Sequence, residues 1–129
     1  MGDLDKTIKI LIIDDSQLMR VAMTKIFAHL GFENTDDVDG GKNALEKMGT
    51  EQYQLIMLDW IMPGMTGLEF LKAAKEIENY KEVPIIVASA ENVEENIAEA
   101  KKAGAAEYLI KPYSPETLQE KLEIVLGGE

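Results

Sequence analysis

Cysteine is absent from this sequence, and histidine occurs only once. The lack of cysteine excludes a disulfide framework, a thiolate metal site and a cysteine nucleophile. It also fits a reducing compartment. The single histidine, His29, falls in a segment with a helical pattern, far in sequence from the carboxyl ends of the expected strands. We therefore expect a structural role for it and no catalytic triad.

Positive charge and long apolar runs are also scarce. The chain has 13 basic and 24 acidic residues, a net charge of −11 that argues against a nucleic-acid partner, because phosphates would be repelled over most of the surface. No apolar run approaches the roughly 18 residues of a membrane helix. Residues 1–6 lack the cationic start and apolar stretch of a secretory signal. We expect a cytoplasmic protein that does not associate with membranes.

The chain has 129 residues, of which 46% are hydrophobic and 6% aromatic. This composition is typical of a folded chain and not of a disordered one. The length suits one domain with a full core, and no linker or internal repeat divides it. We expect a single domain over residues 1–129.

Short apolar runs alternate with longer helical patterns along the chain. Four runs are apolar enough for buried strands, and a more polar run at 33–38 is typical of an edge strand; the four are 8–13, 55–58, 83–87 and 108–110. Helix starts and stops separate them, namely Thr66 with Glu69, Asn92 with Glu95, Ser114 with Pro115, and the stops Gly31 and Gly104.

Five such strand–helix units predict an α/β fold, a parallel sheet with helices on both faces and right-handed crossovers. In sheets of this kind, ligands bind beyond the carboxyl ends of the strands, where the strand order reverses. The residues at those ends are therefore the candidates for function.

Every expected central strand ends in an ionisable or hydroxyl residue. These residues are Asp14, Asp15, Asp59, Ser89 and Lys111. Any one of them could simply mark the point where the chain emerges into solvent. Together, three acids, a hydroxyl and a lysine at one edge favour a functional site.

The chemistry of this set favours a cation and a phosphoryl group. Carboxylates about 4 Å apart repel by about 4 kcal/mol per pair at an effective dielectric near 20, so three of them need a positive partner. Oxygen ligands without His or Cys select a hard ion, and a few carboxylates suggest Mg²⁺. Lys111 supplies fixed positive charge, and the Ser89 hydroxyl can donate to a phosphoryl oxygen. An aspartate in such a site can attack phosphorus and form an aspartyl phosphate.

Several segments, in this order and spacing, resemble the response-regulator receiver domain over essentially the whole chain. They are Asp14-Asp15 after an apolar strand, Asp59 after the run 55–58, the Met-Pro-Gly-Met-Thr-Gly segment at 62–67, Ser89-Ala90, and Lys111-Pro112. The pairs Asp59-Trp60 and Tyr108 before Lys111 make the chain most similar to the family's single-domain chemotaxis regulators. The resemblance implies a flavodoxin-like (βα)5 fold with strand order 2-1-3-4-5 and no output domain.

The resemblance also implies a role for each site residue. Asp59 would accept the phosphoryl group. Asp15 and Asp59 would bind Mg²⁺ directly, Asp14 through a water, and Ile61 through its backbone carbonyl. Lys111 would pair with the phosphoryl group, and Ser89 would hydrogen-bond it. The protein would not be an enzyme but a phosphoacceptor with intrinsic Mg²⁺-dependent phosphorylation and dephosphorylation chemistry.

The resemblance further implies a switch and a set of partners. Ser89 and Tyr108 would form the switch, Tyr108 moving from an exposed to a buried rotamer. The surface that changes would be the partner face, formed by Ala90, Val93, Ala103, Tyr108 and Lys121. The implied partners are a histidine kinase of the chemotaxis type, a flagellar motor switch protein or other effector, and a phosphatase.

Three departures from the chemotaxis pattern leave alternatives open. Ile61 stands where Asn is usual, Ser89 replaces the commoner Thr, and Val93-Glu94-Glu95 is acidic where the enteric regulator is basic. A phosphorelay intermediate or phosphate sink without a flagellar target is therefore an alternative. A Mg²⁺-dependent phosphatase of small molecules is another, but such enzymes place a second, proton-donating Asp where this chain has Ile61.

Overall fold

Five parallel strands form one sheet in the order β2-β1-β3-β4-β5. This arrangement confirms the fold expected from the sequence. The computed structural model describes residues 4–90 and 94–127. The strands are β1 Ile10–Ile13, β2 Thr35–Val38, β3 Leu55–Asp59, β4 Ile85–Ser89 and β5 Glu107–Ile110. The helices are α1 Gln17–His29, α2 Gly41–Thr50, α3 Gly67–Lys75, α4 Glu94–Lys102, α5 Pro115–Leu126 and the 3₁₀ helix η1 Glu78–Tyr80.

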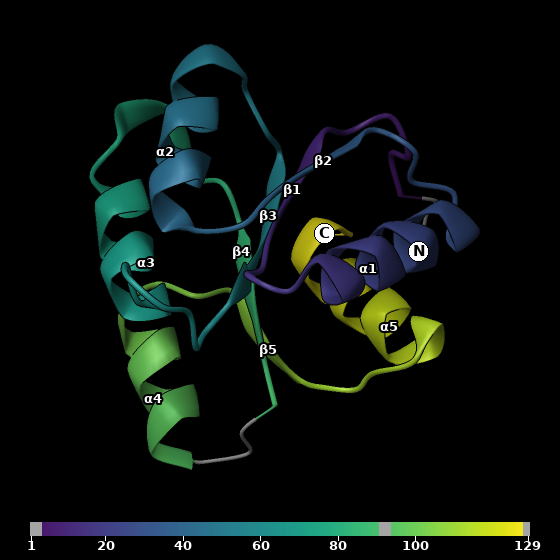
Figure 1. Cartoon of the computed structure of the whole chain (residues 1–129). Helices are drawn as coiled ribbons and strands as arrows, with labels where there is room; N and C mark the ends of the chain where they lie inside the picture. The colour runs from purple at the N-terminus through teal and green to yellow at the C-terminus, as the bar shows by residue number, and fades with distance from the viewer. Residues whose placement is uncertain (1–3, 91–93, 128–129) are drawn as a thin grey trace.

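Helices cover both faces of the sheet (Figure 1): α1 and α5 lie on one side, and α2, α3 and α4 on the other. Because successive side chains of a strand point to opposite faces, each buried strand contributes to two cores. In β1, Ile10 and Ile12 join the core that contains Leu118 and Leu122 of α5. Leu11 and Ile13 join the core on the other face. The apolar runs without polar alternation are explained by this burial on both faces.

The edge position of β2 explains its polar sequence. This strand pairs only with β1, and its residues Asp36 and Asp37 are not fully buried. The position expected for the run 33–38 is therefore confirmed.

Three strands begin later than the sequence predicts. The edge strand expected from residue 33 begins at Thr35. The strand expected from residue 83 begins at Ile85, because Pro84 has no N–H to donate to the sheet. Pro84 contributes only its carbonyl, which accepts from the Ile56 N–H at 3.1 Å. The strand expected from residue 8 begins at Ile10, because the Lys9 N–H donates to the side-chain oxygen of Gln54 at 2.7 Å.

The helix boundaries follow the predicted signals. Thr66 and Glu69 form a reciprocal capping box at the start of α3, and the Ser114 side chain caps α5. Gly31 and Gly104, at the ends of α1 and α4, adopt positive φ angles of 99° and 115°, which disfavour residues with a Cβ. Asn92, the expected cap of α4, lies outside the described residues.

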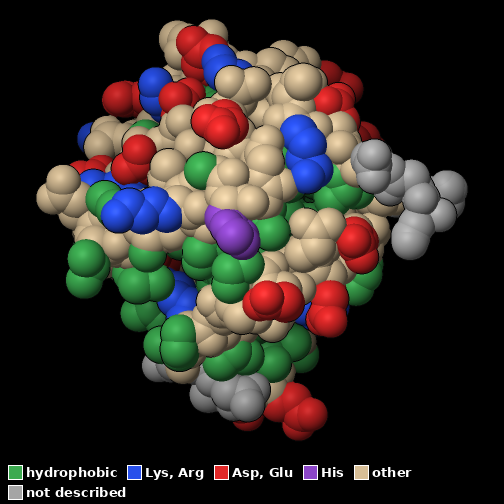
Figure 2. All heavy atoms as spheres, turned by 90° about the vertical axis from the view of Figure 1, so that its right-hand side faces the viewer, with side chains coloured by type: hydrophobic (Ala, Val, Ile, Leu, Met, Phe, Trp, Pro, Cys, Tyr) green, Lys and Arg blue, Asp and Glu red, His purple; other side chains and the backbone are tan. Residues whose placement is uncertain are grey.

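The face of the molecule formed by α1 and α5 carries charges of both signs (Figure 2). Figure 2 shows the face of α1 and α5, where acidic and basic side chains are interspersed and the single histidine lies at the surface. His29 is the last residue of α1 and is exposed. Within residues 4–90 and 94–127, no helix is both long and apolar enough to span a bilayer.

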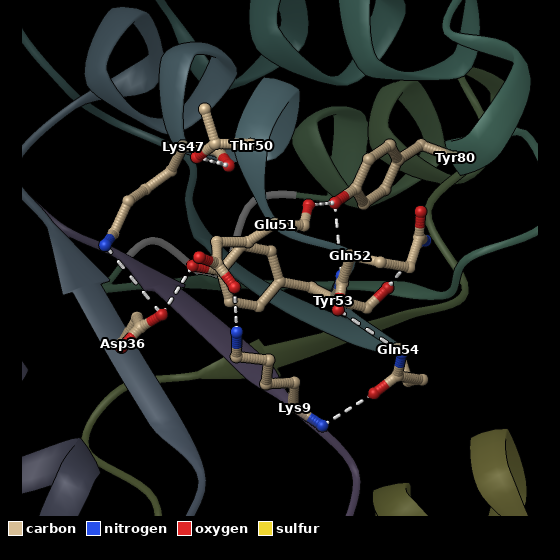
Figure 3. A network of polar contacts seen from close by, with 9 residues as sticks. All are labelled: Lys9, Asp36, Lys47, Thr50, Glu51, Gln52, Tyr53, Gln54 and Tyr80. Atoms are coloured by element: carbon tan, nitrogen blue, oxygen red, sulfur yellow. Dashed lines mark hydrogen bonds and ion pairs between the residues drawn. The ribbon is translucent and has the colours of Figure 1, made fainter.

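A polar network ties β2, α2 and η1 to the amino ends of β1 and β3 (Figure 3). The Tyr53 hydroxyl donates to Asp36 Oδ2 at 2.6 Å, and the Tyr53 N–H donates to the Tyr80 hydroxyl at 3.1 Å. Tyr80 in turn donates to the Glu51 carbonyl, and Lys9 pairs with the Glu51 carboxylate. The network lies at the sheet edge opposite to the carboxyl ends, so we interpret it as structural.

This network gives a stability prediction. Replacing Tyr53 with Phe should lower the free energy of unfolding by about 1–2 kcal/mol, because it removes a buried ring's hydrogen bond to a carboxylate. Urea unfolding measures the change. Lys47→Met is the control, because Lys47 is only an exposed partner of Asp36 at 3.9 Å and its loss should change stability by less than about 1 kcal/mol. If both variants lost the same free energy of unfolding, the stabilising role of the Tyr53 hydrogen bond would be contradicted.

Candidate functional site

Three carboxylates meet at the carboxyl edge of the sheet. Asp14 and Asp15 follow β1, and Asp59 ends β3, the neighbouring parallel strand. One oxygen from each of the three lies within 4.8 Å of the others. Asp14 and Asp59 are buried, with 1% and 7% of their surface exposed, whereas Asp15 is exposed. The structure thus brings together the three acids that the sequence placed at strand ends.

Every polar group of Asp14 makes a hydrogen bond. Its N–H donates to the Val38 carbonyl at 3.1 Å, and its carbonyl accepts from Arg20 Nη1 at 2.7 Å. One carboxylate oxygen accepts from the Ser16 N–H at 2.9 Å, and the other from Lys111 Nζ at 2.9 Å. Asp14 is therefore the fixed member of the cluster.

Among the described residues, Lys111 has the only side-chain cation that contacts the carboxylate groups of the cluster. It follows β5, and its Nζ lies 2.9 Å from Asp14 Oδ2 and 3.3 Å from Asp59 Oδ1. Burial by itself would lower the pKa of Lys111, but its bonds to Asp14 and Asp59 outweigh burial and raise the pKa above the usual value. Lys111 is therefore charged at neutral pH.

The carboxyl group of Asp59 is a weaker acid than that of an ordinary aspartate. Burial, opposed by Lys111 and reinforced by the negative charges of Asp14 and Asp15, raises the pKa of Asp59 to about 6. The carboxylate is ionised at neutral pH, but at a free-energy cost that a nearby cation would relieve. The three carboxylates carry more negative charge than the single lysine can neutralise. Their oxygens are the ligands that a hard divalent ion such as Mg²⁺ prefers, so these residues fit that ion.

The other predicted site residues lie around this cluster. Ser89 is fully buried at the end of β4, next to β3, and its carbonyl accepts from the Lys111 N–H at 2.8 Å. Ile61 is 56% exposed and lines a surface cleft together with Trp60 and Glu99. Tyr108 is only 6% exposed, so the exposed position from which the resemblance has it move is not the one in this structure.

Lys121, one of the residues expected at the partner face, belongs to an ion-pair group that the sequence did not indicate. Glu107, at the start of β5, accepts from Lys121 of α5 at 3.0 Å and lies 3.6 Å from Lys101 of α4. Burial opposes the ionisation of Glu107, but the two lysines lower its pKa below the usual value. Ala90 is exposed, Ala103 is half-buried, and Val93 lies outside the described residues.

Two further residues near the site were missed at the level of sequence. Arg20 reaches the Asp14 carbonyl from α1, a contact that helical spacing alone does not show. Tyr113 follows Lys111 by two residues, and its hydroxyl is buried with no hydrogen-bond partner among the described residues. Burial and the negative charge of Asp14 both raise the pKa of this phenol.

The class of protein follows from this fold and site. Residues 10–123 match the response regulator receiver domain, and the chain belongs to that family. The strand order and the acidic edge described above are arranged as the resemblance to this family implies.

Among its relatives are chemotaxis proteins. The chain is 39% identical over 120 residues to the chemotaxis protein CheY-3 of Vibrio cholerae, and the match covers 93% of this chain and 92% of that protein. The solved structure of Vibrio cholerae CheY4 is similar with a TM-score of 0.87 and 36% identity, covering 93% of this chain and 99% of that one.

A more distant structure shows the same fold. It is the receiver domain of a sensor histidine kinase from Pseudomonas aeruginosa, solved with a magnesium ion in its active-site cleft. The TM-score is 0.86 at 24% identity, and the match covers 95% of this chain and 99% of that one. At this identity the likeness concerns the fold alone.

The raised pKa of Asp59 predicts that protons compete with Mg²⁺. As pH falls through about 6, Asp59 becomes protonated, and the apparent Mg²⁺ affinity should drop by up to about tenfold per pH unit. The emission of Trp60, next to Asp59, measures binding. An affinity that stays constant from about pH 8 to about pH 5 would contradict the raised pKa.

Tyr113 gives a prediction of the opposite sign to Tyr53. Because its hydroxyl has no partner among the described residues, Tyr113→Phe should leave the free energy of unfolding unchanged or raise it by up to about 1 kcal/mol. Urea unfolding beside Tyr53→Phe provides the comparison. A loss of more than about 1 kcal/mol would reveal a partner for the hydroxyl.

Proposed function

We propose that this protein is a two-component response regulator of the chemotaxis type, phosphorylated on Asp59 by a histidine kinase in the presence of Mg²⁺. The observation that carries the proposal is the contact of Asp59 with Lys111 inside a cluster of three acids. The similarity to CheY proteins over more than nine-tenths of the chain supports the chemotaxis assignment.

The proposed reaction uses Asp59 as the nucleophile. An ionised Asp59 oxygen attacks the phosphorus of a phosphohistidine; the P–N bond breaks, a P–O bond forms, and the leaving imidazole takes a proton from solvent. Asp14, Asp15, Asp59 and the backbone carbonyl of Ile61 would hold Mg²⁺, which supplies charge neutralisation at the transferred group. Lys111 exchanges its bond to Asp59 for one to the phosphoryl group.

The proposed output is a change in the affinity of the partner face. Ser89 and Tyr108 would form the switch: the Ser89 hydroxyl would bond to the new phosphoryl oxygens, and Tyr108 would be buried in the phosphorylated protein. The partner face would then bind a flagellar motor switch protein or another effector. The ion pairs of Glu107 support this proposal, since they couple α4 and α5 to the strand that carries Tyr108.

A phosphorelay intermediate or a phosphate sink is the second candidate. The exposed Ile61 beside the site and the acidic first turn of α4, with Glu94 and Glu95, favour it. Phosphotransfer from this chain to a histidine-containing domain would support this candidate. Phosphate-dependent binding of a motor switch peptide would support the first. Sustained turnover of a phosphate ester would indicate instead a small-molecule phosphatase.

Phosphorylation is tested by intact-mass measurement after incubation with acetyl phosphate and Mg²⁺. The wild type should gain one phosphoryl group, and Asp59→Asn should gain none because the amide is a poor nucleophile. Asp39→Asn is the matched control, since Asp39 lies in the loop after β2 and bonds to Asn43 instead of joining the cluster. A phosphoryl group on the Asp59→Asn variant, or none on the wild type, would contradict the proposal.

A further inference from the structure

Arg20 is the only arginine among the 13 basic residues of the chain. It lies in α1, and its side chain is 15% exposed. The guanidinium reaches two acceptors on different strands. Nη1 donates to the backbone carbonyl of Asp14, after β1, at 2.7 Å. Nε donates to Asp37 Oδ2, in β2, at 2.7 Å.

The carbonyl of Asp14 belongs to the peptide that leads into Asp15. Because a peptide is planar, fixing this oxygen also fixes the plane that contains the nitrogen and Cα of Asp15. The carboxylate of Asp15 makes no hydrogen bond or ion pair in the part of the chain that the structure describes. The orientation of the peptide before it is therefore the restraint on this residue. Arg20 therefore fixes the orientation of the peptide that leads into Asp15, the one exposed acid in the cluster.

We propose that Arg20 is a positioning residue for the cation site, which orients Asp15 through the Asp14–Asp15 peptide. The proposal rests on the proposed function, because it concerns the Mg²⁺ that Asp15 would bind there. Asp37 supports this role, because its carboxylate binds Nε of the guanidinium and thereby fixes the direction in which Nη1 points.

The residue type matters for this role. A planar guanidinium can serve two acceptors in a fixed geometry, whereas a lysine ammonium is a flexible point charge. Simple electrostatics predicts the opposite outcome, because a positive charge near the cluster repels an incoming cation. The two explanations are therefore separated by the sign of the change in Mg²⁺ affinity.

The test measures Mg²⁺ dissociation constants from Trp60 emission, with the urea unfolding midpoint recorded separately for each variant. Arg20→Lys and Arg20→Met should both weaken Mg²⁺ binding by about tenfold. The matched control is Lys25→Met, which removes an exposed positive charge from the same helix and should leave the affinity within about twofold of wild type.

A double-mutant cycle then tests the route through Asp15. In an Asp15→Asn background, Arg20→Lys should cause no further loss of Mg²⁺ affinity, because the group that Arg20 orients is no longer a carboxylate. A purely structural role would lower the unfolding midpoint equally in both backgrounds and leave the affinity unchanged.

The outcomes separate this inference from the proposed function. If Arg20→Lys binds like the wild type and Arg20→Met binds more tightly, Arg20 acts only as a charge and the inference is wrong. Unchanged affinity in both Arg20 variants also overturns it, while the proposed site stands. If the wild type itself does not bind Mg²⁺, the proposed site is wrong, and the inference falls with it.

Discussion

Mutual repulsion of three carboxylates at one edge of a parallel sheet is the constraint on which the site depends. Asp14 and Asp59 are buried, and Lys111 is the cation that contacts both. The remaining negative charge, added to burial, raises the pKa of Asp59. The proposed function uses two properties of this carboxylate. Its ionised form is stabilised by a nearby cation, and in that form it is a nucleophile that can accept a phosphoryl group.

The fold holds each of the three aspartates in a different way. Asp14 is fixed at every polar group, and Asp59 is set by the end of the central strand β3. Asp15 projects into solvent, and only its backbone is constrained, through the carbonyl that Arg20 holds. The polar network of Tyr53 and Tyr80 lies at the opposite edge of the sheet, away from the three carboxylates (Figure 3).

The sequence predicted the strands, the edge position of the run 33–38 and the acids at the sheet edge because these follow from local patterns, whereas the strand order was implied by the resemblance to the receiver family. Apolar runs, capping pairs and strand-end acids can be seen within a few residues. The late start of β1 depends on a hydrogen bond with Gln54, which is distant in the sequence, and the late start of β4 follows from Pro84, which a count of apolar residues does not take into account. The roles of Arg20, Glu107 and Tyr113 were also missed, because each depends on which side chains the completed fold brings together.

The most direct test of this account is the pKa of the Asp59 carboxyl group, measured by NMR with and without Mg²⁺. The account predicts a value of about 6 without the ion and a decrease of at least about one pH unit when Mg²⁺ is added. A pKa close to the ordinary value of 3.8 that does not respond to Mg²⁺ would contradict it. In that case the three carboxylates would not act together as one cation site.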